Sequence, residues 1–322
     1  MKYGFKNNVK TSLGILSFFC LLLQGCIDPV TPEFEFKEGL VFVEGFASTS
    51  EGASFVVVSK SVDEFGVNKT KFEKGALVSF INSDTGASIQ LTEQGDAYVP
   101  PPDFKAAVGE RWELAITFLD GTQYESSSEK VLEPVPIADV SATYDTQLRF
   151  SEGSNDFEPG HAIAITFDDP VDQENYYYWT FRTFENVIVC EICFDGILRN
   201  GECTPTTVPQ PDYFTYNCPT ECWRIRFPET INIFDDQLSN GKTTTNLTVA
   251  EVPLYTKREI LVELQQFSLT PSAYEYYKVL KDIVDNSAGF NAPPPAALIG
   301  NMINVNDPND FVFGRFTAAS TT

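Results

Sequence analysis

Histidine is nearly absent from this chain, and the motifs of common enzyme sites are missing too. The single histidine, His161, follows Gly160 at the expected start of a strand, where a surface-edge position explains it more simply than general-base catalysis. The sequence holds no Gly-x-Ser-x-Gly elbow, no His-Glu-x-x-His pair, no P-loop and no Gly-x-Gly-x-x-Gly turn. We therefore expect no catalytic residues, no cofactor and no enzyme activity.

Positive charge is also scarce. Lysine and arginine number 22 against 45 acidic residues, which gives a formal net charge of −23. A protein this acidic is repelled by phosphate backbones and by anionic lipid headgroups. The composition therefore argues against nucleic acid as a partner.

A long apolar run is the third absence. The most apolar stretch, residues 13–23, follows three lysines and is too short to cross about 30 Å of hydrocarbon, which takes roughly 20 helical residues. A basic start followed by a short apolar core is typical of a secretory signal peptide. We therefore expect residues 1–25 to be a signal peptide rather than a membrane-spanning helix.

The signal peptide ends in Leu23-Gln24-Gly25-Cys26, which resembles a lipobox. Small Gly25 fits the peptidase pocket before the cleavage point, and the Cys26 thiol is the atom that takes up diacylglycerol. The alternative is an ordinary signal peptide with a coincidental cysteine. We expect fatty acyl chains on Cys26 to anchor the protein in an outer membrane, since each buried CH₂ contributes about 0.8 kcal/mol. Residues 26–38, with two prolines and several acids, are then an extended tether that lifts the body off the membrane.

Helical periodicity is largely missing as well, and short β-rich segments take its place. Residues 40–46 and 53–59 are rich in β-branched and aromatic residues, and residues 112–119 alternate strictly, as in a half-buried strand. Residues 76–81 and 87–92 flank a polar turn that contains Gly86, which is a hairpin signal. We expect residues 39–136 to form a β-sandwich domain that ends at Pro134-Val135-Pro136, because two such prolines do not fit a central strand.

A second β-rich domain is expected over residues 137–322, with a Cys-rich insertion at 186–224. Its strand candidates are 138–144, 161–167, 175–184, 258–267 and 311–317. Thr270-Pro271 begins the one clear helix, which has an apolar stripe at helical spacing and ends near 286–289. The predicted fold class is mainly β, with two β-sandwich-like domains, one C-terminal helix and a Cys-rich loop.

Five cysteines lie within the expected insertion, in the pattern C-x₂-C-x₉-C-x₁₄-C-x₃-C: Cys190, Cys193, Cys203, Cys218 and Cys222. In an oxidising compartment such clustering indicates disulfides, which would close a Pro- and Thr-rich segment with little to bury. Zinc bound by four thiolates is the competing interpretation. An odd number of cysteines leaves at least one thiol unpaired, and the spacing leaves the pairing open.

Acidic loops are the remaining candidates for a metal or for catalysis. Residues 168–174 and 304–310 are rich in Asp and Asn but lack the spacing of a known calcium loop, and local turn chemistry explains the same composition. A hydrolase with paired carboxylates, such as Asp168 and Asp169, would need two acids to converge in a cleft. We expect no metal site.

The aromatic segment 176–184 has two faces if it is a strand. Tyr176, Tyr178, Thr180 and Arg182 share one face, and Tyr177, Trp179 and Phe181 share the other. One face belongs to a core. The other face has two interpretations: it is core or plain sheet surface, or it is an aromatic platform for sugar, peptide or protein. Core or plain sheet surface is the simpler interpretation.

Several short motifs, taken in order along the chain, resemble a known family. They are the lipobox, Val43-Glu44-Gly45, Gly75-Ala76-x-Val78, Pro134-Val135-Pro136, Leu-Thr-Pro-x-x-Tyr-x-Tyr-Tyr at 269–277, Gly300-Asn301-x-Ile303 and Phe313-Gly314-Arg315-Phe316. Together they resemble the Bacteroidetes outer-membrane lipoproteins called domain of unknown function 4249. The resemblance implies a location beside TonB-dependent receptors and carries no catalytic residues to transfer.

The expected function combines these points. We expect a lipid-anchored, surface-exposed outer-membrane protein that is a non-catalytic accessory or ligand-capture partner of a TonB-dependent receptor. The Cys-rich insertion would be its recognition element. The rival from another class is a structural or adhesive surface protein that binds host or matrix ligands.

Overall fold

The structure is a computed structural model that describes residues 37–151, 153–171, 173–194, 196–205, 214–256, 258–286 and 298–322. The expected signal peptide, the lipidation site Cys26 and nearly all of the expected tether lie outside these residues. Residues 38–322 form one compact unit, which the following paragraphs describe.

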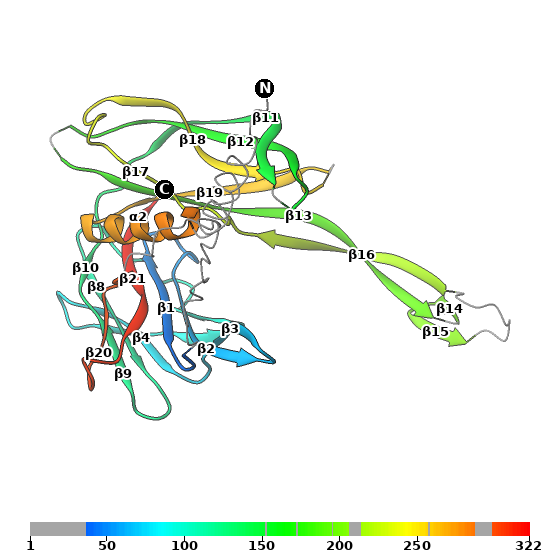
Figure 1. Cartoon of the computed structure of the whole chain (residues 1–322), viewed down its shortest axis with the longest axis horizontal. Helices are drawn as coiled ribbons and strands as arrows, with labels where there is room; N and C mark the ends of the chain where they lie inside the picture. The colour runs from blue at the N-terminus through cyan, green and yellow to red at the C-terminus, as the bar shows by residue number, and fades with distance from the viewer. Residues whose placement is uncertain are drawn as a thin grey trace, which may run out of the picture. The chain divides into compact units, whose positions relative to one another are not determined.

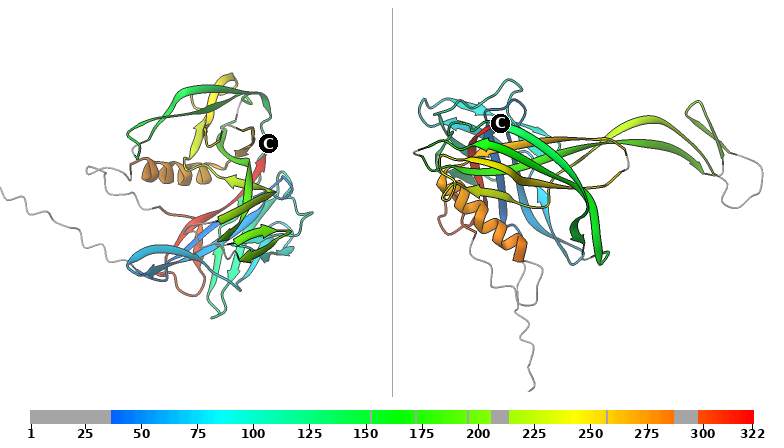
Figure 2. Two further views of the ribbon diagram at one scale, coloured as in Figure 1. Left: turned by 90° about the vertical axis from the view of Figure 1, so that its right-hand side faces the viewer. Right: turned by 90° about the horizontal axis from the view of Figure 1, so that it is seen from above.

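A ten-stranded sheet runs through this unit (Figures 1 and 2). Its strands follow the order β16 (Phe214–Arg226), β13 (Tyr176–Phe194), β19 (Ile260–Ser268), β21 (Val312–Thr321), β1 (Val41–Ser48), β2 (Phe55–Glu64), β7 (Ala97–Val99) and β6 (Thr92–Gln94). Two more strands join from the side: β17 (Asn232–Asp235) pairs with β13, and β3 (Val67–Phe72) pairs with β2.

A six-stranded sheet packs on the β1–β2 part of this sheet. It consists of β20 (Met302–Asn304), β9 (Gln123–Ser126), β8 (Arg111–Thr117), β4 (Leu77–Asn82), β5 (Ser88–Gln90) and β10 (Glu129–Lys130). The strict alternation expected for 112–119 is confirmed, because Trp112, Leu114 and Ile116 are buried in the core between the two sheets. This core is the first sandwich.

The hairpin expected around Gly86 is confirmed as β4 and β5. The Asn82 side-chain oxygen accepts hydrogen bonds from the backbone N–H groups of Asp84 and Thr85, at 3.1 and 3.0 Å. Gly86 has φ +73°, a value that glycine adopts without steric cost. The turn residues therefore set the register that places Val78 and Phe80 in the core.

A three-stranded sheet packs on the β13–β19 part of the long sheet. It consists of β11 (Ile137–Ser151), β12 (Asp156–Asp168) and β18 (Thr243–Pro253). Ile165, Phe167 and Val249 pack here against Tyr177 and Trp179 of β13. A small hairpin of β14 (Gly196–Arg199) and β15 (Glu202–Pro205) completes the strands.

The expected helix is present as α2 (Pro271–Asn286). The Thr270 hydroxyl accepts a hydrogen bond from the Ala273 N–H at 3.2 Å, and Pro271 occupies the first helical position, where no N–H is needed. Tyr274 and Tyr277 face the long sheet, and the Tyr277 ring stacks on Tyr178 of β13 at 4.8 Å. Over the described residues the fold is thus mainly β with one helix, as the sequence predicts. Within the described residues no helix has the length and apolarity to cross a membrane.

The last strand joins the two halves of the chain. β21 runs parallel to β1, with Val312 opposite Val41, and its C-terminal end pairs antiparallel with β19. Val135, in the Pro-Val-Pro segment, is buried among residues of the second half and accepts a hydrogen bond from the Gln266 side chain at 2.6 Å. The division into domains at residue 136 stays a prediction. The ten-stranded sheet contains strands from both sides of that position.

Candidate functional site

A two-stranded arm is the most distinctive feature of the described structure. β19 pairs with β13 only as far as Ile260 opposite Glu185, and from Asn186 onward the described partner of β13 in the ladder is β16. We call the part formed by residues 186–205 and 214–223 the arm. It projects from the sheets in Figure 1 and in the right-hand view of Figure 2. At about 3.3 Å per residue, the 19 residues of β13 extend roughly 60 Å.

Two disulfides close the arm. Cys190 is bonded to Cys218, and Cys193 to Cys203. These bonds confirm the disulfide interpretation and leave no four-thiolate set for zinc. Among the described residues Cys222 is the one free cysteine, and it is partly exposed. The sequence could not choose this pairing, because the pairing depends on how β14 and β15 fold back.

Within the arm, the β14–β15 hairpin packs closely on the ladder of β13 and β16. Cys193 is fully buried beneath it, and a Cβ atom added at Gly196 would lie 2.7 Å from the Cys193 sulfur. The Thr215 hydroxyl donates to the Gly196 carbonyl at 3.0 Å and accepts from the Leu198 N–H at 2.8 Å. Only glycine fits at position 196, and the hairpin is therefore held as a rigid cap on the arm.

One face of the arm carries a row of exposed apolar side chains. Residues directly opposite each other in an antiparallel ladder lie on the same face, and the register places Phe184 opposite Ile225, Ile192 opposite Tyr216 and Asn186 opposite Trp223. We call this set the apolar face: Phe184, Ile188, Ile192 and Phe194 of β13, Tyr216, Trp223 and Ile225 of β16, and Leu261 of β19. Phe194, Tyr216 and Trp223 are 73%, 65% and 63% exposed.

The opposite face of the ladder fixes the base of the arm to the body. Glu185 is buried and forms an ion pair with Arg226 at 3.3 Å, and the Arg226 guanidinium lies 4.2 Å from the centre of the Tyr255 ring. Phe181, four residues nearer the body on the same strand, packs against Ile163, Ala250 and Val252. At the base of the arm one face of the ladder is thus buried, and the apolar face is left to solvent.

The aromatic segment 176–184 is covered on both sides along its first part. Tyr177, Trp179 and Phe181 are buried beneath the three-stranded sheet, and Tyr176 and Tyr178 pack against Tyr274 and Tyr277 of α2. The core interpretation is therefore confirmed for this part. The exposed aromatic residues lie further along the same strand. The alternation of residues does not predict where along the strand this exposure begins.

The acidic segment 168–174 meets a second acidic turn. Asp169 and Asp236 are both buried: the Asp169 carboxylate accepts from the Tyr177 hydroxyl at 2.5 Å and from the Gly241 N–H at 3.1 Å, and Asp236 accepts from the Asn175 N–H at 2.9 Å. Burial raises the pKa of Asp169, and the neighbouring charge of Asp236 raises it further. Their partners are groups of the two turns themselves, which explains the pair as a means of joining the turns.

The second acidic segment, 304–310, is also occupied by local contacts. The Asn304 side-chain oxygen accepts from the N–H groups of Asn306 and Asp307, and Asp310 accepts from the Tyr124 hydroxyl at 2.9 Å. In the part of the chain that the structure describes, no group of three or more His, Cys, Asp or Glu residues is placed to hold a metal ion.

The position of His161 differs from the sequence-based expectation. β12 begins at Asp156, so His161 lies inside a strand between β11 and β18 rather than at a sheet edge. Its ring is 5.4 Å from that of Tyr144, its partner across the ladder. The strand starts earlier than expected because residues 156–160 also pair with β11, although they contain Pro159.

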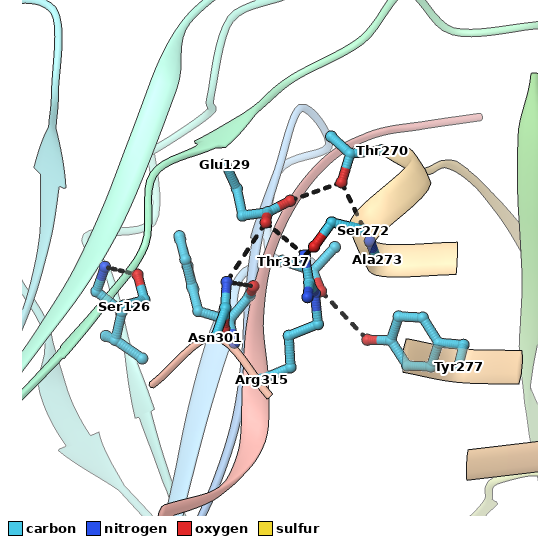
Figure 3. Close-up of polar contacts among 11 residues, drawn as sticks. Ser126, Glu129, Thr270, Ser272, Ala273, Tyr277, Asn301, Arg315 and Thr317 are labelled. Atoms are coloured by element: carbon cyan, nitrogen blue, oxygen red, sulfur yellow. Dashed lines mark hydrogen bonds and ion pairs between the residues drawn. The ribbon is translucent and has the colours of Figure 1, made fainter. Parts of the chain in front are cut away.

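Several of the short motifs along the chain converge on one buried ion pair (Figure 3). Arg315 of β21 pairs with Glu129 of β10, and both residues are 4% exposed. The Thr270 hydroxyl, at the start of α2, donates to Glu129 at 2.9 Å. Asn301 exchanges two hydrogen bonds of 2.9 Å with the backbone of Phe316.

The glycines of the same motifs have a steric reason. A Cβ atom at Gly300 would lie 1.6 Å from the Gly314 carbonyl oxygen, and one at Gly314 would lie 1.8 Å from the Val43 carbonyl oxygen. Gly314 also has φ +101°, in the left-handed region that side chains disfavour. These motifs therefore hold β21 and α2 in place.

Comparison with known proteins agrees with this pattern. A family model described as "Domain of unknown function (DUF4249)" matches residues 27–322. No curated protein and no solved structure matches the chain. Since the match spans the whole set of motifs from Val43 to Phe316, the chain belongs to the family of the domain of unknown function DUF4249.

Proposed function

We propose that the chain is a lipid-anchored, surface-exposed protein of an outer membrane and a non-catalytic partner of a TonB-dependent transporter. The observation that carries this proposal is the apolar face of the arm. Large apolar side chains gathered on a solvated surface mark protein contact sites, and Trp and Tyr are common among the residues that dominate binding energy.

The anchor supports the location. The family match begins at residue 27, directly after Cys26, as expected if the family's mature chain starts at a lipidated cysteine. A lipid on that residue would keep the protein in the same membrane as β-barrel transporters, whose barrels have about 22 strands. Two proteins confined to one membrane meet often, so a modest contact surface is enough for a stable pair.

The rigidity of the arm supports a role in binding. A surface that is already ordered loses less conformational entropy on association, and the two disulfides hold the apolar face before a partner arrives. β16 is also the last strand of its sheet along the arm, and β13 is its ladder partner among the described residues. Its outer edge therefore offers backbone groups that can pair with an extended segment of a receptor.

Affinity purification of the native protein in mild detergent tests the proposal. We expect the wild type to bring down a β-barrel receptor. The variant Phe194→Ala with Trp223→Ala should recover about tenfold less, because truncation of central aromatic residues commonly costs 1 to 2 kcal/mol or more. The control, Val140→Ala with Phe157→Ala, removes exposed apolar groups from the three-stranded sheet and should recover as much as the wild type.

Two results would contradict this function. One is recovery of the protein alone under several gentle conditions, and the other is equal recovery by the arm variant and the control. The phenotype of a deletion strain distinguishes the transport function from the adhesive alternative. Deletion that abolishes growth on a particular nutrient supports transport, whereas deletion that abolishes only attachment supports adhesion.

A further inference from the structure

The chain enters its body beside the β2–β3 hairpin. Glu38 accepts a hydrogen bond from the Asp63 N–H at 3.1 Å, and the Gly39 N–H donates to the Ser61 carbonyl at 2.9 Å. Residues 26 to 38 span at most about 40 Å when fully extended. If Cys26 carries lipid, this end of the sandwich therefore stays within that distance of the membrane.

The tip of the same hairpin presents an aromatic side chain in an unfavourable backbone conformation. Phe65 is fully exposed and has φ +56°, and Gly66 beside it has φ +78°. Asn, Asp and Gly are common at such positions, and an aromatic residue there costs on the order of 1 kcal/mol. The positive φ values of Phe65 and Gly66 belong to the two-residue turn that joins β2 to β3, where Glu64 pairs with Val67. The hairpin requires this backbone conformation but not an aromatic ring, which lies in solvent.

Other exposed apolar residues gather at the same end. Leu119, in the β8–β9 turn, is 84% exposed and lies beside Gly75, which directly follows the lysine-rich hairpin. The Lys60 ammonium group of β2 lies 4.3 Å from the centre of the neighbouring Phe118 ring, so this turn and β2 meet. In Figure 1 the β2–β3 hairpin points to the right in the lower half of the picture, and the turn beside the β9 label lies at the bottom.

The segment between β20 and β21 adds to this group. The Val305 N–H donates to the Gln123 carbonyl at the start of β9, and Phe311 precedes Val312, which pairs with Val41 where β1 begins. Phe311 is 75% exposed. We call the set of Phe65, Val67, Leu119, Val305 and Phe311 the apolar end.

The charge around the hairpin differs from that of the whole chain. Residues 60–74 hold four lysines and three acids, in a protein whose net charge is −23. Lys69, Lys71 and Lys74 are exposed. The hairpin thus carries a small excess of positive charge, and its lysines can accompany apolar side chains into the interface.

We propose that the apolar end is a second membrane contact, at which Phe65, Leu119 and Phe311 insert into the headgroup region of the bilayer. This inference rests on the proposed lipid at Cys26. The lipid holds the chain at the surface, and the apolar end then fixes the orientation of the body. An interfacial contact of this kind reaches about 5 to 10 Å into the boundary between headgroups and acyl chains.

Tryptophan quenching by brominated phospholipids tests this contact. The full-length acylated protein is placed on vesicles of phosphatidylethanolamine and phosphatidylglycerol, as wild type and as Phe65→Trp, Leu119→Trp and Phe157→Trp. The signal of the three native tryptophans is subtracted. We expect the added fluorescence at 65 and 119 to shift to shorter wavelength and to fall roughly twofold with lipid brominated near the headgroup. Phe157→Trp, on the three-stranded sheet, should show neither change.

The controls separate the two proposals. Flotation and mass spectrometry of the N-terminal peptide show whether Cys26 is acylated and the protein is vesicle-bound, and a chain that fails here contradicts the proposed anchor. Acylated, vesicle-bound protein in which positions 65 and 119 respond no more than position 157 would overturn the membrane contact. Circular dichroism checks that each variant is folded. We expect each variant to fold, because the substituted positions are exposed.

Discussion

At the scale of single residues, Arg315 and Glu129 form an ion pair in which both residues are buried. Two charges removed from water must satisfy each other, and here Thr270, Ser272 and Asn301 supply further hydrogen bonds. The buried Arg315 Nε has no hydrogen-bond partner among the described residues. The pair links β10, β21 and the start of α2. Its value is therefore more in fixing one arrangement of these elements than in net stability.

Loss of one partner should be costly. Arg315→Met keeps much of the side-chain volume but leaves Glu129 buried without its counter-charge, and we expect the free energy of unfolding to fall by about 3 to 5 kcal/mol. Urea denaturation followed by circular dichroism measures this. Adding Glu129→Gln should restore at least half of the loss.

A matched control shows whether burial is the cause. Arg182 and Glu263 form a pair at 2.5 Å whose side chains are 35% and 38% exposed. Arg182→Met should cost no more than about 1 kcal/mol. Equal costs for Arg182→Met and Arg315→Met would show that the low exposure of Arg315 has no energetic role.

At the scale of elements, the arm is a local structure attached to a larger core. None of its described residues beyond Asn186 belongs to the four hydrophobic clusters of the body. The two disulfides must therefore hold the arm in one conformation, because a hydrophobic core does not. The sequence pointed to this need through its cysteines and its Pro- and Thr-rich segment.

Removal of the shorter disulfide should loosen the arm without unfolding the body. In Cys193→Ser with Cys203→Ser, the loss of a bridge across 10 residues corresponds to about 2.5 to 3 kcal/mol, or roughly 100-fold faster local amide exchange. Hydrogen exchange measured by mass spectrometry should show this in peptides of β14 and β15, with the melting temperature of the body nearly unchanged. Cys222→Ser is the control and should alter neither; a large fall in the melting temperature would contradict the separation of arm and body.

At the scale of the whole molecule, β21 makes one folding unit of the two halves. It lies between β1 and β19, and its residue Phe316 is buried in the core of the first sandwich. A strand shared in this way couples the stability of both halves. We expect unfolding in one cooperative transition, reported equally by Trp112 in the first half and Trp179 in the second.

Gly314→Ala tests this coupling. The added Cβ would lie 1.8 Å from the Val43 carbonyl oxygen, so β21 must shift away from β1, and we expect a loss of at least about 3 kcal/mol in both halves. Gly86→Ala is the control, because Gly86 has φ +73° but nothing lies within 4 Å of the added atom. It should cost about 1 kcal/mol. A Gly314→Ala protein whose second half melts as in the wild type would disprove the coupling.

The sequence by itself determined the local features of this protein. Alternation fixed which side of β8 is buried, Thr270-Pro271 began the helix, and the turn at Asn82 to Gly86 set a hairpin, because each depends on neighbours along the chain. The clustering of the cysteines, in an expected oxidising compartment, predicted disulfides. The short motifs pointed to the family.

Only the tertiary structure decided the rest. That β21 lies beside β1, that Cys190 pairs with Cys218, and that Asp169 meets Asp236 are facts about residues far apart in sequence. The same holds for exposure. Tyr178 and Phe194 share a strand and a face, yet α2 covers the first and nothing described covers the second, so the apolar face of the arm and the apolar end of the sandwich could be found only once the sheets were assembled.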